Sequence, residues 1–337
     1  MTTTVVEVDD DRWDDLLGED DPDPYCGRSY LAAVTAAART RAVLIVSEGP
    51  GWRVRYPLVL EPLPGGRWLA RTPEYGGPDI LLDGTDAGSS RSLEAAQGSR
   101  RSLDEALVSL GVVSEVFLLS PWLHDRCAVG TAWAARETKP ICLVLASGQE
   151  GRWARLRKGR RSDITRARRE LALTWGPLDD AGAQRFAGHY RLAMDRLGAA
   201  ERWRFDDEWF RTLAERANGR VLVATAEGPE GGATALFLTG RNRAAYYLAS
   251  RWGTAAGGPS LVLWTGIEEL AGAGVRGITL GGGAADGDDD PVLAFKRSFA
   301  DTEVPLLVGA RIFDPVAHDQ AVASGLARPL PPGAVAA

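Results

Sequence analysis

The sequence contains little cysteine and little histidine. Its three cysteines, Cys26, Cys127 and Cys142, are odd in number and match no metal or redox spacing. We therefore expect free thiols in a reducing compartment. The three histidines lie far apart, and no nucleophile motif accompanies them. We expect no metal site, and a reaction by direct attack without a covalent enzyme intermediate.

Lysine is almost absent, although the chain has many positive charges. Of its 39 basic residues only three are lysine, namely Lys139, Lys158 and Lys296. The guanidinium group of arginine cannot replace a compact ammonium at every site. Each remaining lysine is therefore a candidate for a specific role.

Long apolar runs are also absent. No stretch approaches the ~18 apolar residues of a membrane span, and the acidic residues 1–15 lack the apolar region of a signal peptide. We expect a cytoplasmic protein. Its 337 residues, 45% hydrophobic and 25% charged, are typical of a soluble protein with two domains. The net charge of −6 does not favour polyanion binding by the whole molecule, but a local basic patch could bind phosphates.

Each half of the chain predicts helix, then a meander of strands, then helix and strand. In the first half we expect helices at 28–40 and 103–111, and strands at 42–49, 52–62, 66–73, 114–121 and 139–148. In the second half we expect helices at 152–169, 181–198, 206–219 and 259–274, three strands between 219 and 252, and a strand at 277–283. This order favours a mixed α/β fold and does not alternate strictly enough for a Rossmann sheet.

The two halves also resemble each other in sequence. The segment VLIVSEGP at 43–50 returns, one residue longer, as VLVATAEGP at 221–229, and each copy follows helical sequence. A duplicated domain explains the order and context better than a chance match does. We predict domain 1 at 1–148, domain 2 at 149–318 and a Pro-rich C-terminal tail at 319–337.

An ordered set of motifs in the second half points to a known family. The basic helix at 158–169 precedes YYLAS (246–250), GGPSLVLWTGIEEL (257–270), ITLGGG (278–283) and FKRSF (295–299). This set resembles the Fem family of non-ribosomal peptidyltransferases, within the GNAT-like superfamily. The resemblance implies two tandem GNAT-like acyltransferase domains, each a mostly antiparallel mixed sheet flanked by helices.

The resemblance also implies an activity. Fem enzymes move an aminoacyl group from aminoacyl-tRNA to an amine and form an amide bond, as in peptidoglycan or natural-product biosynthesis. We therefore expect aminoacyl-tRNA as co-substrate, no other cofactor, and a small peptide, amino sugar or cell-wall precursor as acceptor. An acyl-CoA donor is the alternative, although residues 251–257 have the wrong spacing for a CoA pyrophosphate loop. An inactive module that binds a nucleotide-linked sugar or an RNA is a third possibility.

The pair Phe295-Lys296 is the predicted centre of the chemistry. In Fem enzymes the matching pair is implied to hold the aminoacyl end of the tRNA and to stabilise the tetrahedral oxyanion. A fixed donor at such an oxygen typically lowers the barrier by about 3 to 4 kcal/mol. The alternative is a solvated lysine beside a core phenylalanine.

The basic helix is a candidate phosphate site, because its positive side chains cover most of its circumference. Arg161 and Arg166 fit the family's Arg-x-x-x-x-Arg pattern and are predicted to bind substrate. The residues predicted to bind tRNA phosphates are Arg155, Lys158, Arg160, Arg168 and Arg169. The alternative is a charged linker helix.

The loop at 75–79, sequence YGGPD, is the candidate acceptor site. Paired glycines, Gly76 and Gly77, let the backbone approach a ligand closely, and Tyr75 precedes them. Asp79 or Asp83 could orient the attacking amine or accept its proton. An ordinary turn is the alternative.

Further candidates lie in the second half. Tyr246 and Tyr247 are adjacent on a strand, so one faces the core and the other the opposite side; the family implies that a tyrosine here contacts substrate. The glycines at 281–283 could offer backbone N–H groups to an anion or form a tight turn. The aspartates at 286–290 predict a solvated loop rather than a metal site.

Overall fold

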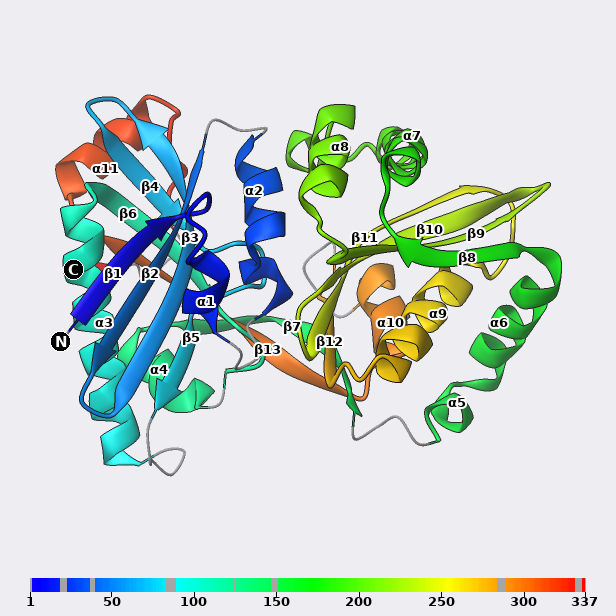
Figure 1. Cartoon of the computed structure of the whole chain (residues 1–337), viewed down its shortest axis with the longest axis horizontal. Coiled ribbons are helices and arrows are strands. Elements are labelled where there is room, and N and C mark those ends of the chain that lie inside the picture. The colour runs from blue at the N-terminus through cyan, green and yellow to red at the C-terminus, as the bar shows by residue number, and fades with distance from the viewer. Residues whose placement is uncertain are drawn as a thin grey trace. The chain divides into compact units, whose positions relative to one another are not determined.

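The computed structural model describes residues 2–18, 23–36, 40–82, 89–123, 125–146, 151–283, 289–330 and 335–336. The chain divides into two compact units. Unit 1 comprises Met1–Thr138 and Pro305–Ala337, and unit 2 comprises Lys139–Val304. Both are built from strands and helices, which confirms the mixed α/β class (Figure 1). In the described part of the chain, no helix has the length and apolar character needed to cross a membrane.

Unit 1 contains a sheet in the order β1-β2-β3-β4-β6-β13, with β5 paired to β3 and β14 to β13. Its strands are β1 (Thr2–Glu7), β2 (Arg41–Gly49), β3 (Trp52–Leu63), β4 (Arg67–Arg71), β5 (Asp79–Leu82), β6 (Val112–Leu119), β13 (Thr302–Ile312) and β14 (Val335–Ala336). Its helices are α1 (Trp13–Leu17), a short 3₁₀ turn (Pro24–Cys26), α2 (Arg28–Ala36), α3 (Ser90–Ser109), α4 (Arg126–Ala132) and α11 (Pro315–Ala323).

Unit 2 contains a sheet in the order β7-β12-β11-β10-β9-β8. Its strands are β7 (Arg136–Leu145), β8 (Ala172–Pro177), β9 (Val221–Gly228), β10 (Gly231–Thr239), β11 (Arg243–Gly253) and β12 (Gly277–Gly281). Its helices are α5 (Arg152–Arg155), α6 (Lys158–Glu170), α7 (Asp180–Leu197), a 3₁₀ turn (Glu201–Trp203), α8 (Asp207–Arg216), α9 (Gly258–Gly272) and α10 (Pro291–Arg297). Figure 1 shows α7 and α8 on one side of these strands and α9 and α10 on the other.

The two units share one order of elements. In unit 1 an antiparallel meander, β1 to β4, leads through α3 to β6, which pairs parallel to β4. In unit 2 the meander β8 to β11 leads through α9 to β12, which pairs parallel to β11. The two copies of the repeated sequence segment form β2 and β9, the second strand of each meander. The chain therefore consists of two tandem GNAT-like units.

The final strand of each sheet comes from the other half of the sequence. β7 follows the first set of elements but pairs antiparallel with β12, whereas β13 ends the second set and pairs antiparallel with β6. The unit boundary consequently falls at 138/139, ten residues before the predicted 148/149, and residues 305–318 belong to unit 1 rather than to domain 2. Within the predicted Pro-rich tail, residues 319–323 continue α11. Sequence alone does not display such pairing between distant segments.

Each unit has its own apolar core. In unit 1 the buried residues come mainly from β2, β3, β6 and α3 and include Tyr56 and Trp133. In unit 2 they come mainly from β9 to β12 and from α9, and they include Phe237 and Phe299. Residues 84–100 predict either a loop or the start of a helix, and α3 begins inside this stretch because the Ser89 hydroxyl accepts the Ser92 N–H at 3.2 Å.

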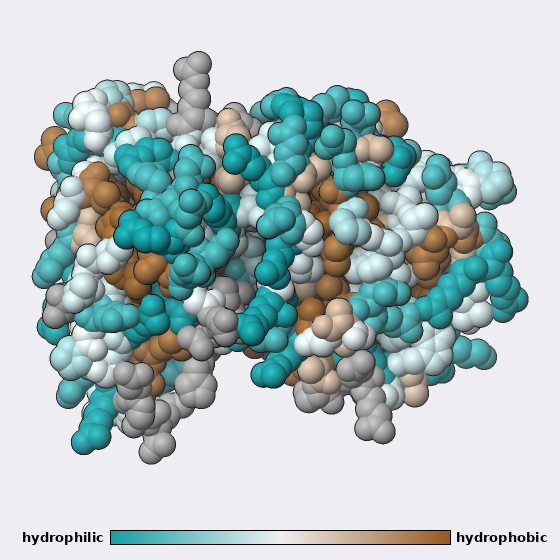
Figure 2. All heavy atoms as spheres, in the orientation of Figure 1, coloured by the Kyte–Doolittle hydropathy of each residue, from teal (hydrophilic) through white to brown (hydrophobic). Residues whose placement is uncertain are grey.

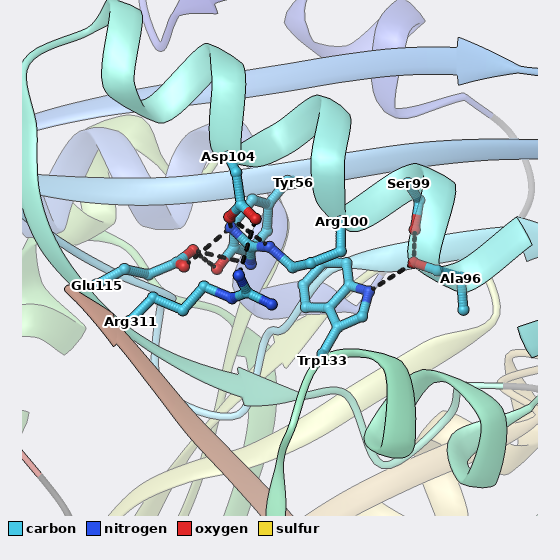
Figure 3. Close-up of polar contacts among 8 residues, drawn as sticks. All are labelled: Tyr56, Ala96, Ser99, Arg100, Asp104, Glu115, Trp133 and Arg311. Atoms are coloured by element: carbon cyan, nitrogen blue, oxygen red, sulfur yellow. Dashed lines mark hydrogen bonds and ion pairs between the residues drawn. The ribbon is translucent and has the colours of Figure 1, made fainter. Parts of the chain in front are cut away.

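The core of unit 1 also contains a cluster of charged side chains (Figure 3). Glu115 and Arg100 are almost completely buried and lie 3.1 Å apart. The Tyr56 hydroxyl donates to the Glu115 carboxylate. Asp104 bridges Arg100, at 2.6 Å, and Arg311 of β13, at 2.9 Å. The cluster thus ties β3, α3, β6 and the returning strand β13 together.

Candidate active site around Lys296

The short helix α10 positions the predicted centre of chemistry. Asp290 caps it: its Oδ1 accepts the N–H groups of Val292 at 2.6 Å and Leu293 at 3.1 Å. Pro291 occupies the first turn, where a missing N–H costs nothing. Leu293 is buried in the core of unit 2. These features place Lys296 in the last turn of a helix with a fixed start.

Lys296 is half-buried, and its ammonium group lies on a glycine turn. Its Nζ donates to the carbonyl oxygen of Gly282 at 2.7 Å. Burial lowers the pKa of Lys296 to about 8, and the Lys139 charge acts in the same direction, whereas Cys142 and Asp290 act in the opposite direction. The lysine is therefore not the solvated surface residue of the alternative interpretation.

Backbone conformation or close packing accounts for each glycine of the turn at 281–283. Gly281 has a φ of 78°, which other residues rarely adopt. A Cβ at Gly282 would lie 2.9 Å from the Pro140 carbonyl oxygen, and a Cβ at Gly283 would lie 2.5 Å from Asp290 Oδ2. The tight-turn interpretation fits this packing. The carbonyl oxygens of the turn accept hydrogen bonds from Lys139 and Lys296.

From the sequence, Lys139 was marked only as a rare lysine and Asp290 only as part of an acidic loop, so neither was predicted to belong to this site. Lys139 of β7 is half-buried and donates through Nζ to the Gly283 carbonyl oxygen at 3.3 Å. Asp290 is buried, so the prediction of a solvated acidic loop is wrong for this residue, whereas Asp289 is exposed. The sequence signal for Asp290 was its place before Pro291, as a helix cap; the signal for Lys139 was the scarcity of lysine.

The loop before α10 also bears on the question of a metal. Asp286 and Asp288 lie outside the described residues. Among the residues that the structure does describe, no group of three or more His, Cys, Asp or Glu side chains is arranged to hold a metal ion.

The basic helix reaches this site through Arg160. Its guanidinium carbon lies 4.9 Å from the Phe295 ring centre and 5.2 Å from that of Phe299. The same group donates to the Ser260 hydroxyl at 2.7 Å and to the Ser298 hydroxyl at 3.2 Å. Arg160 therefore joins α6 to α9 and α10, and two of its five N–H donors serve the fold.

The other predicted phosphate-binding residues differ in their surroundings. Arg155 pairs with Asp301 at 2.9 Å, and Arg168 pairs with Glu268. Lys158 and Arg169 are exposed, and in the described part of the chain neither has a hydrogen-bonded or ion-paired side-chain partner. Figure 2 shows hydrophilic side chains along the edge that α6 forms at the right of the view.

The Arg-x-x-x-x-Arg pair lies on the same helix. Arg161 donates to the Ala154 carbonyl oxygen at 2.7 Å, and the exposed Arg166 lies 3.7 Å from Asp163. The side of α6 that carries Ile164 and Ala167 is buried. The basic residues therefore do not cover the whole circumference of the helix.

The two tyrosines of β11 face opposite sides. Tyr246 is buried against Phe237, with ring centres 5.6 Å apart, and burial raises its pKa. Tyr247 is half-buried, and its ring centre lies 6.1 Å from that of Trp209. Tyr247 is thus the more accessible candidate for substrate contact.

The loop of unit 1 packs on its own chain. A Cβ at Gly77 would lie 2.0 Å from the Leu118 carbonyl oxygen, and one at Gly76 would lie 2.6 Å from the Cβ of Tyr25. The ring centre of Tyr75 lies 6.0 Å from that of Tyr25. Close packing explains both glycines without a ligand.

Of the two predicted aspartates of this loop, Asp79 lies in the described part of the chain. Asp79 begins β5, and its carboxylate lies 3.5 Å from a guanidinium nitrogen of Arg55, which is 1% exposed. That buried arginine also donates to the Leu17 carbonyl oxygen. Asp79 therefore has a structural partner in unit 1. Asp83 lies outside the described residues.

Within unit 2, the structure brings Lys296, Lys139 and Asp290 to the glycine turn, and Arg160 to the adjacent Phe295. Tyr75, Gly76, Gly77 and Asp79 belong to unit 1. The ammonium site thus stands on residues of one unit, and it offers positive charge to a developing or permanent anion.

Known structures share this arrangement of elements. The chain is similar to FemX, with 11% identity over 87% of this chain and 92% of that chain and a TM-score of 0.66. It is also similar to L-PGS from Bacillus licheniformis (12% identity, 95% and 97% covered, TM-score 0.55). A third similar structure is the C-terminal domain of a putative lysylphosphatidylglycerol synthetase from Agrobacterium fabrum (16%, 95% and 97%, TM-score 0.53).

No protein-family model and no curated protein matches the sequence. The similarities to the solved structures establish the fold alone: the chain has the Fem-type, GNAT-like fold that its motifs predict.

Proposed function

We propose that this chain is an acyltransferase that moves an aminoacyl group from aminoacyl-tRNA to the amine of a small peptide, amino sugar or cell-wall precursor. The observation that carries the proposal is the half-buried Lys296 ammonium on the Gly282 carbonyl, next to Phe295 in the chain. A fold does not define an activity, so the proposed activity depends on this site. The Fem-type fold supports it.

The proposed reaction uses charge stabilisation and no covalent intermediate. The acceptor nitrogen attacks the ester carbonyl, a C–N bond forms, and the C–O bond to the tRNA breaks. The carbonyl oxygen becomes negative in the tetrahedral intermediate, and the Lys296 ammonium stabilises it. The proton lost by the nitrogen ends on the leaving 3′-oxygen, so the tRNA leaves as an alcohol. The exposed cations Lys158, Arg166 and Arg169 are proposed to bind tRNA phosphates.

An acyl-CoA donor is the second candidate. The observation in its favour is the start of α9, where Gly257 provides no side-chain cap and the first-turn N–H groups could meet a phosphate. Against it, a Cβ at Gly257 would lie 2.5 Å from the Asp163 carbonyl oxygen, so α6 packs closely on this turn. The aminoacyl-tRNA donor is therefore preferred.

The donor can be identified by direct assay. Purified protein is incubated with charged tRNA, or with acyl-CoA, and a panel of amines. We expect the aminoacyl ester to be consumed faster than without protein, with an amide as product, and tRNA to raise the melting temperature more than CoA does. Turnover with acyl-CoA alone would favour the second candidate. Binding without turnover of either donor would make the chain a binding module.

The pH dependence of the transfer should report the charge of Lys296. Its ammonium form is present below a pKa of about 8 and is lost above it. With a donor whose α-amino group is acylated, and a weakly basic acceptor such as methoxyamine, neither reactant titrates across the range. The rate should then be flat below about pH 8 and fall about tenfold per unit above it. A rate that remains constant from pH 7 to pH 10 would contradict a role for the charged form.

A further inference from the structure

Two of the three lysines of the sequence meet at one glycine turn. Lys296 Nζ donates to the carbonyl oxygen of Gly282 at 2.7 Å, and Lys139 Nζ donates to that of Gly283 at 3.3 Å. The two carbonyls are consecutive in the chain, and the Lys139 charge acts on Lys296, so the two ammonium groups lie within range of each other. The lysines come from β7 and α10, which are far apart in sequence.

Among the described residues, no carboxylate forms an ion pair with either ammonium. Lys139 and Lys296 each use one of three N–H donors on a glycine carbonyl. Asp290, the carboxylate that acts on Lys296, already caps α10 through its Oδ1. Two like charges in a half-buried place repel each other. An anion that contacts both would relieve this repulsion.

The other titratable groups that the structure describes around the site do not supply such an anion. Cys142 of β7 is buried, and burial raises the pKa of its thiol to about 11, so it is neutral at pH 7. Glu303 of β13 acts on Cys142 but is held by Arg297 at 2.9 Å. The described surroundings of the two lysines therefore carry an excess of positive charge.

The space at the turn explains why residue 139 is a lysine in an arginine-rich chain. A Cβ at Gly282 would lie 3.4 Å from both Cδ and Cε of Lys139, and 2.9 Å from the Pro140 carbonyl oxygen. A compact ammonium on a thin stem fits this space, whereas the planar guanidinium of arginine is wider.

We propose that Lys139 is the second cationic residue of the Lys296 site, and that the two ammonium groups together bind one anionic oxygen of the acyl donor. That this oxygen belongs to an acyl donor rests on the proposed function, whereas the existence of a two-lysine anion site does not. The oxygen is either the oxyanion formed from the ester or a phosphate oxygen of the donor.

The anion site can be tested without any assay of activity. Because the chain has three lysines, ¹⁵N-lysine labelling gives at most three side-chain NMR signals, with the exposed Lys158 as an internal control. Inorganic phosphate should shift the Lys139 and Lys296 signals over the same concentration range. In Lys139→Met the Lys296 signal should no longer respond, whereas Lys139→Arg should retain part of the response. A response of Lys158 alone, or a Lys296 response unchanged in Lys139→Met, would overturn the inference.

Activity then tests the link to the donor. If both lysines act on one oxygen, Lys139→Met should lower the rate about 10²-fold, and adding it to Lys296→Met should cost less than about tenfold more. A fall in kcat would identify the oxyanion, and a rise in KM a donor phosphate. Normal kinetics of Lys139→Met beside an inactive Lys296→Met would refute the inference and leave the proposed function intact. Phosphate binding by both lysines without any turnover would refute the proposed function alone.

Discussion

Replacing Lys296 by methionine is expected to lower kcat for acyl transfer by about 10²–10³-fold while the chain stays folded. Methionine keeps most of the apolar stem that packs in the half-buried site and removes the charge. The oxyanion then forms without its cation, and the expected loss of rate is the one that removal of an oxyanion hydrogen-bond donor causes. The measurement is single-turnover kinetics with saturating donor, so that binding and chemistry are separated.

The same substitution should not destabilise the protein. Burial lowers the pKa of Lys296, which means that folding disfavours its charged form at pH 7, and removing the charge removes that penalty. The melting temperature of Lys296→Met should therefore equal or exceed that of the unsubstituted chain. Arg211→Ala is the matched control, because it removes an exposed cation of the same unit that pairs only with Glu208 and Glu215 on α8 in the described structure. Full activity of Lys296→Met would refute the proposed role.

Replacing Glu115 by glutamine is expected to destabilise unit 1 by about 3–5 kcal/mol, because it removes one of the two carboxylates that pair with the buried Arg100. Glu115 is 0% exposed, and Arg100, at 3.1 Å, is 2% exposed. The substitution leaves the two arginines of the cluster, Arg100 and Arg311, with Asp104 as their one carboxylate among the residues drawn in Figure 3. Burial opposes the charge of Arg100, but Glu115 and its neighbours keep its pKa raised, so the arginine stays charged.

Equilibrium unfolding in urea measures this effect, with a separate probe for each unit because two units need not unfold together. Glu105→Gln is the control: Glu105 lies on α3, is exposed, and should change stability by no more than about 0.5 kcal/mol. A Glu115→Gln variant as stable as Glu105→Gln would show that the cluster is not a stabilising ion-pair network.

The sequence alone determined the features that depend on near neighbours in the chain. Apolar periodicity and turn residues placed three strands of each meander, β2 to β4 and β9 to β11, but missed the first strand of each, β1 and β8. The repeated segment at 43–50 and 221–229 predicted the duplication that β2 and β9 reveal. The motif order predicted the Fem-type fold and placed Phe295-Lys296 after a glycine turn. Each strand, turn and motif is recognised from a few consecutive residues, because caps, turns and strand alternation are local effects.

The tertiary structure decided what depends on segments far apart in sequence. β7 and β13 each join the other half's sheet, since buried strand edges must find hydrogen-bonding partners wherever these lie. This exchange moved the unit boundary, set Arg311 against Asp104 in unit 1, and brought Lys139 to the turn that holds Lys296 in unit 2. The scarcity of lysine marked Lys139 and Lys296 as unusual; only the pairing of β7 with β12 could show that they act on the same turn.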